Sequence, residues 1–175
     1  MHKDTLPLKV DPFRFAENAV SLNGALFIKE MQRFCSSLAS DQGEVKVSMT
    51  FDRDEQGIRH IKGRITTEVM LQCQRCLRPF KHEIINEFLL GIVHTEEEAD
   101  RLPDRYDPLI VSDGALVISD MIEEELIISL PLVPMHNTKD CNAEVFHESS
   151  AHEVSVGRES PFKVIESLRS KRKKI

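Results

Sequence analysis

The sequence predicts an α+β fold, in which an antiparallel β-sheet meander packs with two or three helices and a flexible C-terminal tail follows. Apolar and polar residues alternate over 45–51, 61–73 and 84–92, a period of two that is typical of half-buried strands. Short turns join these segments, so we expect neighbouring strands to run antiparallel. Residues 28–38 and 120–130 carry apolar residues at helical spacing and are candidates to cover the apolar face of the sheet.

The N-terminal part of the chain should contribute a short strand and the first helix. Leucine and valine alternate at positions 6, 8 and 10, and Pro12 should stop the strand that they predict. Residues 21–27 are ambiguous, because Asn23-Gly24 within them is a turn signal. Residues 28–38 then carry one apolar helix face, formed by Met31, Phe34, Cys35 and Leu38.

The connection between the predicted strands 61–73 and 84–92 carries a C-x-x-C pair, Cys73 and Cys76. Such a pair can be half of a zinc site, a redox pair or two unrelated buried thiols. Redox chemistry usually requires a helix start within a βαβ unit, which the alternation here does not predict. The zinc and the unrelated-thiol interpretations both stay open.

A zinc ion in a structural site needs four ligands, and the chain offers two more after the second predicted helix. These candidates are His136 and Cys141, five residues apart. If the protein has a cofactor, we expect it to be zinc, held by Cys73, Cys76, His136 and Cys141.

The C-terminal half should contain an acidic loop, a second helix and a tail. Residues 95–108 are predicted to form the loop, and two short strands should flank Asp113-Gly114. The helix 120–130 has capping-box spacing at its start and a proline after its end, and we expect Glu123, Glu124 and Glu125 on or beside its exposed side. The domain prediction is one folded domain over 1–134, a flexible linker over 135–160, and a short amphipathic segment with a basic tail over 161–175.

Composition limits the class of protein. The chain has 175 residues and a net charge of −6, and it contains no run of 18 apolar residues that would span a membrane. Its N-terminus lacks an apolar signal core, and its four cysteines form no dense framework, so we expect a cytoplasmic protein. The absence of Trp and the single Tyr argue against an aromatic platform for single-stranded nucleic acid.

Charge is segregated into three blocks along the chain. The acidic block covers 96–125, a candidate contact for a basic protein, and it lies between two basic blocks that are candidates for RNA contact. The alternative is that each block is only a solvated face or tail. The candidate RNA-binding residues are Arg59, Lys62, Arg64, Arg75, Arg78 and Lys81 in the first basic block, and Arg169, Lys171, Arg172, Lys173 and Lys174 in the second.

Four motifs together resemble the YceD family, the bacterial large ribosomal RNA subunit accumulation proteins. They are Leu-Pro-Leu-Lys-Val-Asp-Pro at 6–12, the cysteine turn at 71–80, Leu-Pro-Leu-Val-Pro-Met-His at 130–136, and Pro-Phe-x-x-Ile-x-x-Leu at 161–168. The resemblance implies a role in synthesis, processing or stability of 23S ribosomal RNA, with that RNA or pre-50S particles as the partner. It implies no catalytic residue. Many members of the family carry a second cysteine-rich stretch after the helix, where this chain has His136 and Cys141.

The leading functional hypothesis is therefore a non-enzymatic ribosome-biogenesis factor that binds ribosomal RNA, a ribosomal protein, or both. A zinc-stapled protein-interaction module without RNA contact is the main alternative. An RNA-processing nuclease is less favoured, because metal-dependent hydrolysis needs carboxylates clustered in the core and the acidic residues here are predicted on a loop and a helix surface. No phosphate-binding glycine motif indicates the use of a nucleotide.

Overall fold

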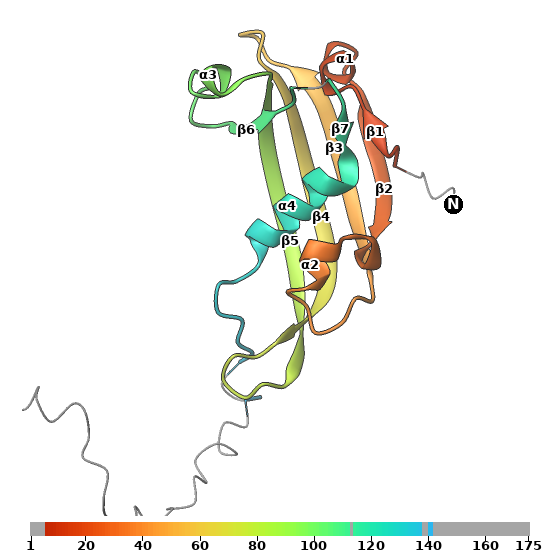
Figure 1. Cartoon of the computed structure of the whole chain (residues 1–175), viewed down its shortest axis with the longest axis vertical. Coiled ribbons are helices and arrows are strands. Elements are labelled where there is room, and N and C mark those ends of the chain that lie inside the picture. The colour runs from red at the N-terminus through yellow and green to blue at the C-terminus, as the bar shows by residue number, and fades with distance from the viewer. Residues whose placement is uncertain (1–5, 113, 138–139, 142–175) are drawn as a thin grey trace, which may run out of the picture. The chain divides into compact units, whose positions relative to one another are not determined.

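A five-stranded sheet is the frame of the molecule (Figure 1). The computed structural model describes residues 6–112, 114–137 and 140–141. Neighbours in the order β2–β3–β4–β5 are antiparallel, and β6 adds a parallel edge to β5. The α+β prediction with an antiparallel meander is thus confirmed. The strands are β2 (Ser21–Phe27), β3 (Glu44–Arg53), β4 (Arg59–Gln72), β5 (Pro79–Val93) and β6 (Asp107–Ile110).

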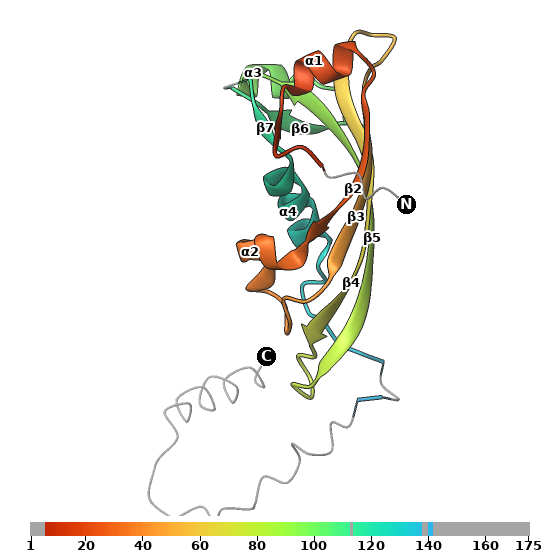
Figure 2. The ribbon, with the colours of Figure 1, turned by 90° about the vertical axis from the view of Figure 1, so that its right-hand side faces the viewer.

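The helices α1 (Pro12–Glu17), α2 (Gln32–Cys35) and α4 (Ile118–Ser129) all lie on one side of this sheet, and the sheet curves around them (Figure 2). A two-stranded sheet of β1 (Lys9–Val10) and β7 (Leu116–Val117) joins the N-terminal segment to the start of α4. Among the described residues, none of the helices is both long and apolar enough to cross a membrane. Within residues 6–112, 114–137 and 140–141, no helix lies on the opposite face of the sheet (Figure 2). The even-numbered side chains of β4 point to this outer face, because side chains alternate along a strand.

The core lies between the sheet and these helices. Alternate residues of β4 are buried there, and Gly63 takes the position between Ile61 and Ile65. The ring of Phe88 lies directly over Gly63, where a Cβ atom would be 2.2 Å from the Phe88 Cζ. Glycine is required at this position because the ring occupies the space of a side chain. Other fully buried side chains include Phe34, Phe51, Leu71, Ile122 and Leu126.

The continuous helix predicted over 28–38 is wrong. The segment forms a 3₁₀ turn, η1 (Ile28–Glu30), and then the four-residue α2, with Met31 between them at φ −105° and ψ 84°. Two distant contacts break it: the N–H of Ile28 donates to the carbonyl of Gly43, and the start of α2 binds a carboxylate of α4. Met31 and Phe34 of the predicted apolar face are nevertheless buried.

Pro12 starts a helix rather than only ending a strand. The Asp11 carboxylate accepts a hydrogen bond of 3.0 Å from the N–H of Arg14 and so caps α1, and Pro12 occupies its first turn. Proline suits this position because its missing N–H would have no helical partner there. The ambiguous residues 21–27 form β2, and the acidic loop contains one helical turn, α3 (Glu96–Ala99).

The second predicted helix is confirmed, with its start two residues earlier than expected. It begins at Ile118, follows Val117, and has no side-chain cap, so the predicted capping box is not formed. The placement of Glu123 on the exposed side is also wrong, because Glu123 is buried. Its Oε1 accepts hydrogen bonds from the backbone N–H groups of Arg33 (2.8 Å) and Phe34 (3.1 Å) at the start of α2.

The turn between β3 and β4 is held by Asp54. Its carboxylate accepts hydrogen bonds from the N–H groups of Gln56 and Ile58, from the hydroxyl of Tyr106 and from Arg105. Burial alone would raise the pKa of Asp54, but these hydrogen bonds outweigh it and hold the pKa below the ordinary value of 3.8.

The predicted division at residue 134 stays a prediction. Residues 135–137 and 140–141, at the start of the predicted linker, lie beside the turn between β4 and β5. The remainder of the linker and the basic segment 161–175 lie outside the described residues.

Candidate metal centre and basic surface at the hairpin tip

The turn between β4 and β5 holds the two cysteines of the C-x-x-C pair in a tight loop, which we call the hairpin tip (residues 73–78). The N–H of Cys73 donates to the carbonyl of Arg78 (3.0 Å), and the N–H of Leu77 donates to the carbonyl of Cys73 (2.9 Å). Leu77 closes the loop at φ +58°, a left-handed conformation that costs a non-glycine residue ~1–2 kcal/mol. Both cysteines are buried.

The chain that follows α4 runs down to this hairpin tip (Figure 1). The N–H of Gln74 donates to the carbonyl of Pro134 (2.9 Å), and the Arg75 guanidinium lies 3.8 Å from the Met135 sulfur. These contacts place His136 beside Cys76, whose Sγ is 3.7 Å from Nε2 and 4.0 Å from Nδ1 of the ring.

Contacts of Asp140 link the last cysteine to the segment around His136. The N–H of Asp140 donates to the carbonyl of Asn137 (3.0 Å), and the carbonyl of Asp140 lies 2.9 Å from Nε2 of His136. One ligand atom from each of four residues gathers within 4.8 Å of the others, and we call this the Cys-His cluster: Cys73, Cys76, His136 and Cys141.

Electrostatics differ between the sulfur atoms of the Cys-His cluster. Burial disfavours the Cys73 thiolate, but backbone N–H groups, including that of Arg75 at 3.4 Å from the sulfur, outweigh it and lower the pKa of Cys73 to about 6. Burial, and then hydrogen bonds with the other two thiols, raise the pKa of Cys141 to about 11. All four cysteines of the described chain are free thiols.

The six residues of the first basic block, from Arg59 to Lys81, are spread along the hairpin of β4 and β5. The strand β4 has 14 residues and spans roughly 45 Å, so Arg59 and the hairpin tip lie at opposite ends. Lys62 and Arg64 share the outer face, as the alternation predicts, and Arg75 and Arg78 lie on the tip. The six cations therefore do not form a single patch.

Three of the six make ion pairs with neighbouring carboxylates. Arg59 lies 2.7 Å from Glu17, Arg64 lies 3.2 Å from Glu87, and Lys81 lies 2.7 Å from Glu68. Each pair is exposed, so its net energy is small and a phosphate could displace the carboxylate at little cost. Arg169, Lys171, Arg172, Lys173 and Lys174 lie outside the described residues.

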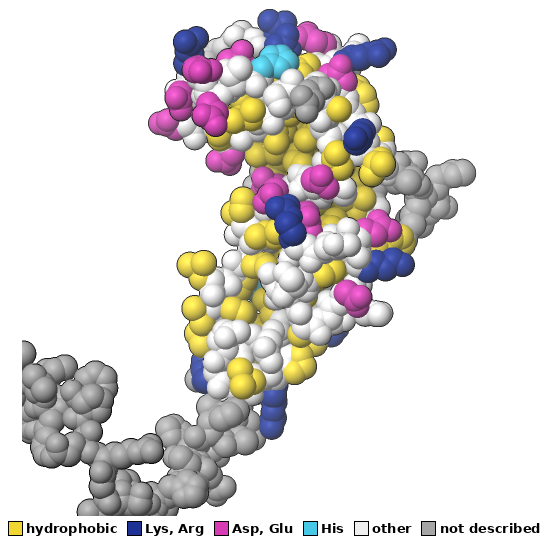
Figure 3. All heavy atoms as spheres, viewed as in Figure 1, with side chains coloured by type: hydrophobic (Ala, Val, Ile, Leu, Met, Phe, Trp, Pro, Cys, Tyr) yellow, Lys and Arg dark blue, Asp and Glu magenta, His cyan; other side chains and the backbone are white. Residues whose placement is uncertain are grey.

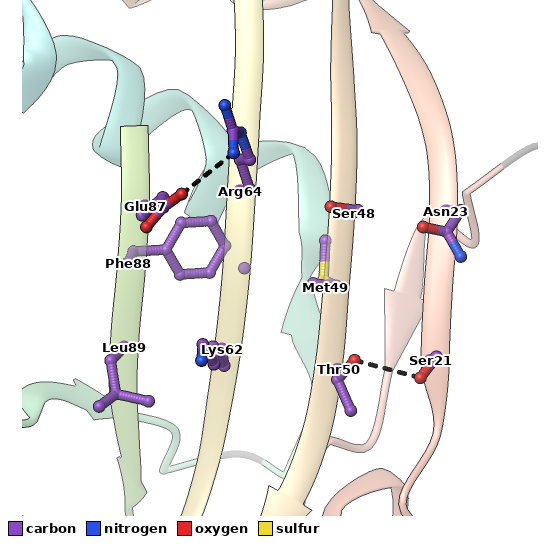
Figure 4. Close-up of a pocket in the computed structure, with 11 residues that line it drawn as sticks. Ser21, Asn23, Ser48, Met49, Thr50, Lys62, Arg64, Glu87, Phe88 and Leu89 are labelled. Atoms are coloured by element: carbon purple, nitrogen blue, oxygen red, sulfur yellow. Dashed lines mark hydrogen bonds and ion pairs between the residues drawn. The ribbon is translucent and has the colours of Figure 1, made fainter. Parts of the chain in front are cut away.

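A shallow hollow of about 580 Å³ opens around Lys62 and Arg64 on the outer face (Figure 4). Strand register places two rows of side chains across it: Ser21, Thr50, Lys62 and Leu89 in one, and Asn23, Ser48, Arg64 and Glu87 in the other. We call these two rows the polar face. Its serine, threonine and asparagine residues were not predicted as site residues, although Ser48 and Thr50 alternate with the buried apolar residues of β3, which was a usable signal.

A second hollow, of about 540 Å³, lies between the start of β5 and residues 135–137 and 140. Arg78, Lys81 and the Phe80 side chain line it together with His136. The rings of Phe80 and His136 are 5.4 Å apart and tilted by 44°. The hollow thus combines two cations with an aromatic ring next to the hairpin tip.

Acidic side chains gather at the opposite end of the sheet, over α3, where some lysine and arginine side chains also project. The end at the hairpin tip shows lysine and arginine and no acidic side chain in this view (Figure 3). Other members of the acidic block have structural contacts instead. Glu123 binds the start of α2, and Glu125 accepts a hydrogen bond of 3.0 Å from the Asn86 side chain. Burial raises the pKa of Glu125 above its ordinary value. Asp113 lies outside the described residues.

Comparisons with known proteins agree on one family. Residues 61–169 match the family described as "Large ribosomal RNA subunit accumulation protein YceD". A protein of that name from Haemophilus influenzae is 32% identical to this chain over 180 residues, which cover 98% of the chain and 100% of the relative. No solved structure matches the chain.

Proposed function

The chain belongs to the YceD family of large ribosomal RNA subunit accumulation proteins, and from this membership we propose that it is a non-enzymatic factor in ribosome biogenesis. It would support the synthesis, processing or stability of 23S ribosomal RNA, in the cytoplasm where ribosomes assemble. Its partner would be that RNA, free or within pre-50S particles.

The observation that carries the RNA contact is the separation of charge along the hairpin. Arg75, Arg78 and Lys81 lie at or beside the turn that joins β4 to β5, whereas the other end of β5 leads to the acidic α3. A phosphate backbone would be attracted to the tip and repelled by the other end. Arginine can also bind phosphate through two parallel hydrogen bonds.

The polar face extends this surface. Lys62 and Arg64 stand among serine, threonine and asparagine side chains, which donate hydrogen bonds to phosphate and ribose oxygens in RNA complexes. None of the helices that the structure describes covers this side of the sheet (Figure 2), so those helices leave it accessible to a folded RNA segment. The acidic end would remain available for a basic ribosomal protein.

The surroundings of the buried carboxylate, Glu123, support a non-enzymatic role. Among the described residues, Glu123 is the only buried carboxylate, and hydrogen bonds to Arg33 and Phe34 already occupy it. Metal-dependent phosphodiester hydrolysis needs several carboxylates that converge on one site.

Filter binding to 23S ribosomal RNA fragments across a salt series tests the proposal. Replacing Arg75 and Arg78 with Glu should weaken binding at least tenfold and reduce the slope of log affinity against log salt by ~1.5–2, because two phosphate contacts are lost. The control is Arg14→Glu with Arg101→Glu, which makes the same charge change at two exposed arginines near α1 and α3. Equal loss in both variants, or no RNA binding by the wild-type chain, would contradict the proposal; the second result would favour a protein-interaction module.

A further inference from the structure

We propose that Cys73, Cys76, His136 and Cys141 bind one zinc ion in a closed tetrahedral site, and that this ion fixes the chain after α4 to the hairpin tip. The proposal is independent of RNA binding, since it rests on the geometry of the Cys-His cluster and on the packing of the segment after α4.

The spacing of the ligand atoms is the first argument. Zn–S bonds of about 2.3 Å place the sulfur atoms of a tetrahedral site ~3.8 Å apart. The four ligand atoms here lie within 4.8 Å of one another, so shifts of about an ångström or less would complete the tetrahedron. Three thiols and one imidazole are a standard donor set for structural zinc, and four protein ligands leave no open position for catalysis.

The groups around the ligands are the second argument. Metal-bound histidine usually donates its other ring N–H to a carbonyl, and Nε2 of His136 lies 2.9 Å from the carbonyl of Asp140. This hydrogen bond leaves Nδ1 as the ligand atom, at 4.0 Å from the Cys76 sulfur. The N–H of Arg75 points at the Cys73 sulfur from 3.4 Å, as expected for a group that stabilises a bound thiolate.

The weak packing of the attached segment is the third argument. After α4 the chain exposes large apolar side chains, with Leu132 at 101%, Val133 at 56% and Met135 at 50% of full exposure. Few apolar contacts therefore hold this segment in place, and a metal ion would supply the attachment that apolar burial does not. Thiolate-rich sites select zinc over harder ions such as Mg²⁺ or Ca²⁺.

Metal analysis of the full-length purified chain, combined with thermal unfolding, tests this site. We expect about one zinc ion per chain, and a fall of the wild-type Tm by roughly 10 °C or more after a strong chelator, reversed by added Zn²⁺. Cys76→Ser and Cys141→Ser should each lose the zinc. Cys35→Ser is the control and should keep the zinc, because Cys35 lies outside the Cys-His cluster, where its thiol donates a hydrogen bond of 3.0 Å to the carbonyl of Ile28.

The chelator experiment uses the wild-type chain, so it decides the question even if a variant fails to fold. Less than about 0.1 zinc per chain together with an unchanged Tm in chelator would overturn the proposal. Loss of zinc from Cys35→Ser equal to that from Cys76→Ser would also overturn it, as would another metal at full occupancy. Failure of RNA binding in zinc-loaded protein would leave the metal site intact and count only against the proposed function.

Discussion

Glu123 should be a large contributor to stability although it belongs to the acidic block. Replacing Glu123 with Ala removes the acceptor for the N–H groups of Arg33 and Phe34 at the start of α2. Phe34 is fully buried, so water cannot replace the lost partner of its N–H. Loss of a helix cap costs ~0.5–2 kcal/mol, and a buried unpaired donor costs ~1–3 kcal/mol. We therefore expect Glu123→Ala to lower the free energy of unfolding by about 2–4 kcal/mol.

Two companion variants isolate the cause. Glu123→Gln keeps an oxygen for the two backbone groups and loses the contact with the Arg33 guanidinium, so it should cost ~1 kcal/mol. Glu124→Ala removes an exposed ion pair with the same arginine, both side chains being 55% exposed, and should cost less than ~0.5 kcal/mol. Urea unfolding measures the free energy of unfolding of all three variants, and an unchanged m-value shows that the variants differ from the wild type in stability alone. The reasoning is refuted if Glu123→Ala costs no more than Glu124→Ala, or if the glutamine variant is as unstable as the alanine variant.

Three further outcomes are expected. Gly63→Ala should lower the free energy of unfolding, measured in urea, by ~1–3 kcal/mol, because the new methyl group clashes with the Phe88 ring. Adding Phe88→Leu to this variant should recover part of the loss. If the losses of the two single variants simply add in the double variant, the clash is not the cause. Because the pKa of Asp54 is lowered on folding, its ionised form adds stability above pH ~4, and this stability disappears as the pH falls through the folded pKa. Asp54→Asn should therefore lower the free energy of unfolding at pH 6 and lower it less at pH 3. An equal effect at both pH values would exclude this linkage. Deleting residues 169–175 should weaken binding to 23S fragments only partly in filter assays; complete loss would shift the RNA contact to the tail.

The long strands were predictable because their signal is local. Along β4, every second residue from Ile61 to Leu71 faces the core, so the alternation of apolar and polar residues can be seen directly in the sequence. The start of α1 also had a local signal, Asp11 followed by Pro12, but six residues are too few to show a helical period.

Other features depend on residues that are distant in the chain. The break at Met31 follows from the cap that Glu123 supplies from 90 residues away. The helical spacing of the apolar residues does not reveal this contact. The C-x-x-C pattern identified Cys73 and Cys76 as candidate ligands, whereas their approach to His136 and Cys141 depends on a segment without periodicity. Metal binding by the Cys-His cluster and RNA contact by the basic residues stay predictions.

Co-sedimentation with pre-50S particles tests the central claim, that the hairpin tip meets the large-subunit RNA. Wild-type chain and the Arg14→Glu/Arg101→Glu control, both shown to be folded by urea unfolding, should migrate with the particles on a density gradient. The Arg75→Glu/Arg78→Glu variant, equally folded, should remain at the top of the gradient. Migration of this variant with the particles to the same extent as the wild type would contradict the account.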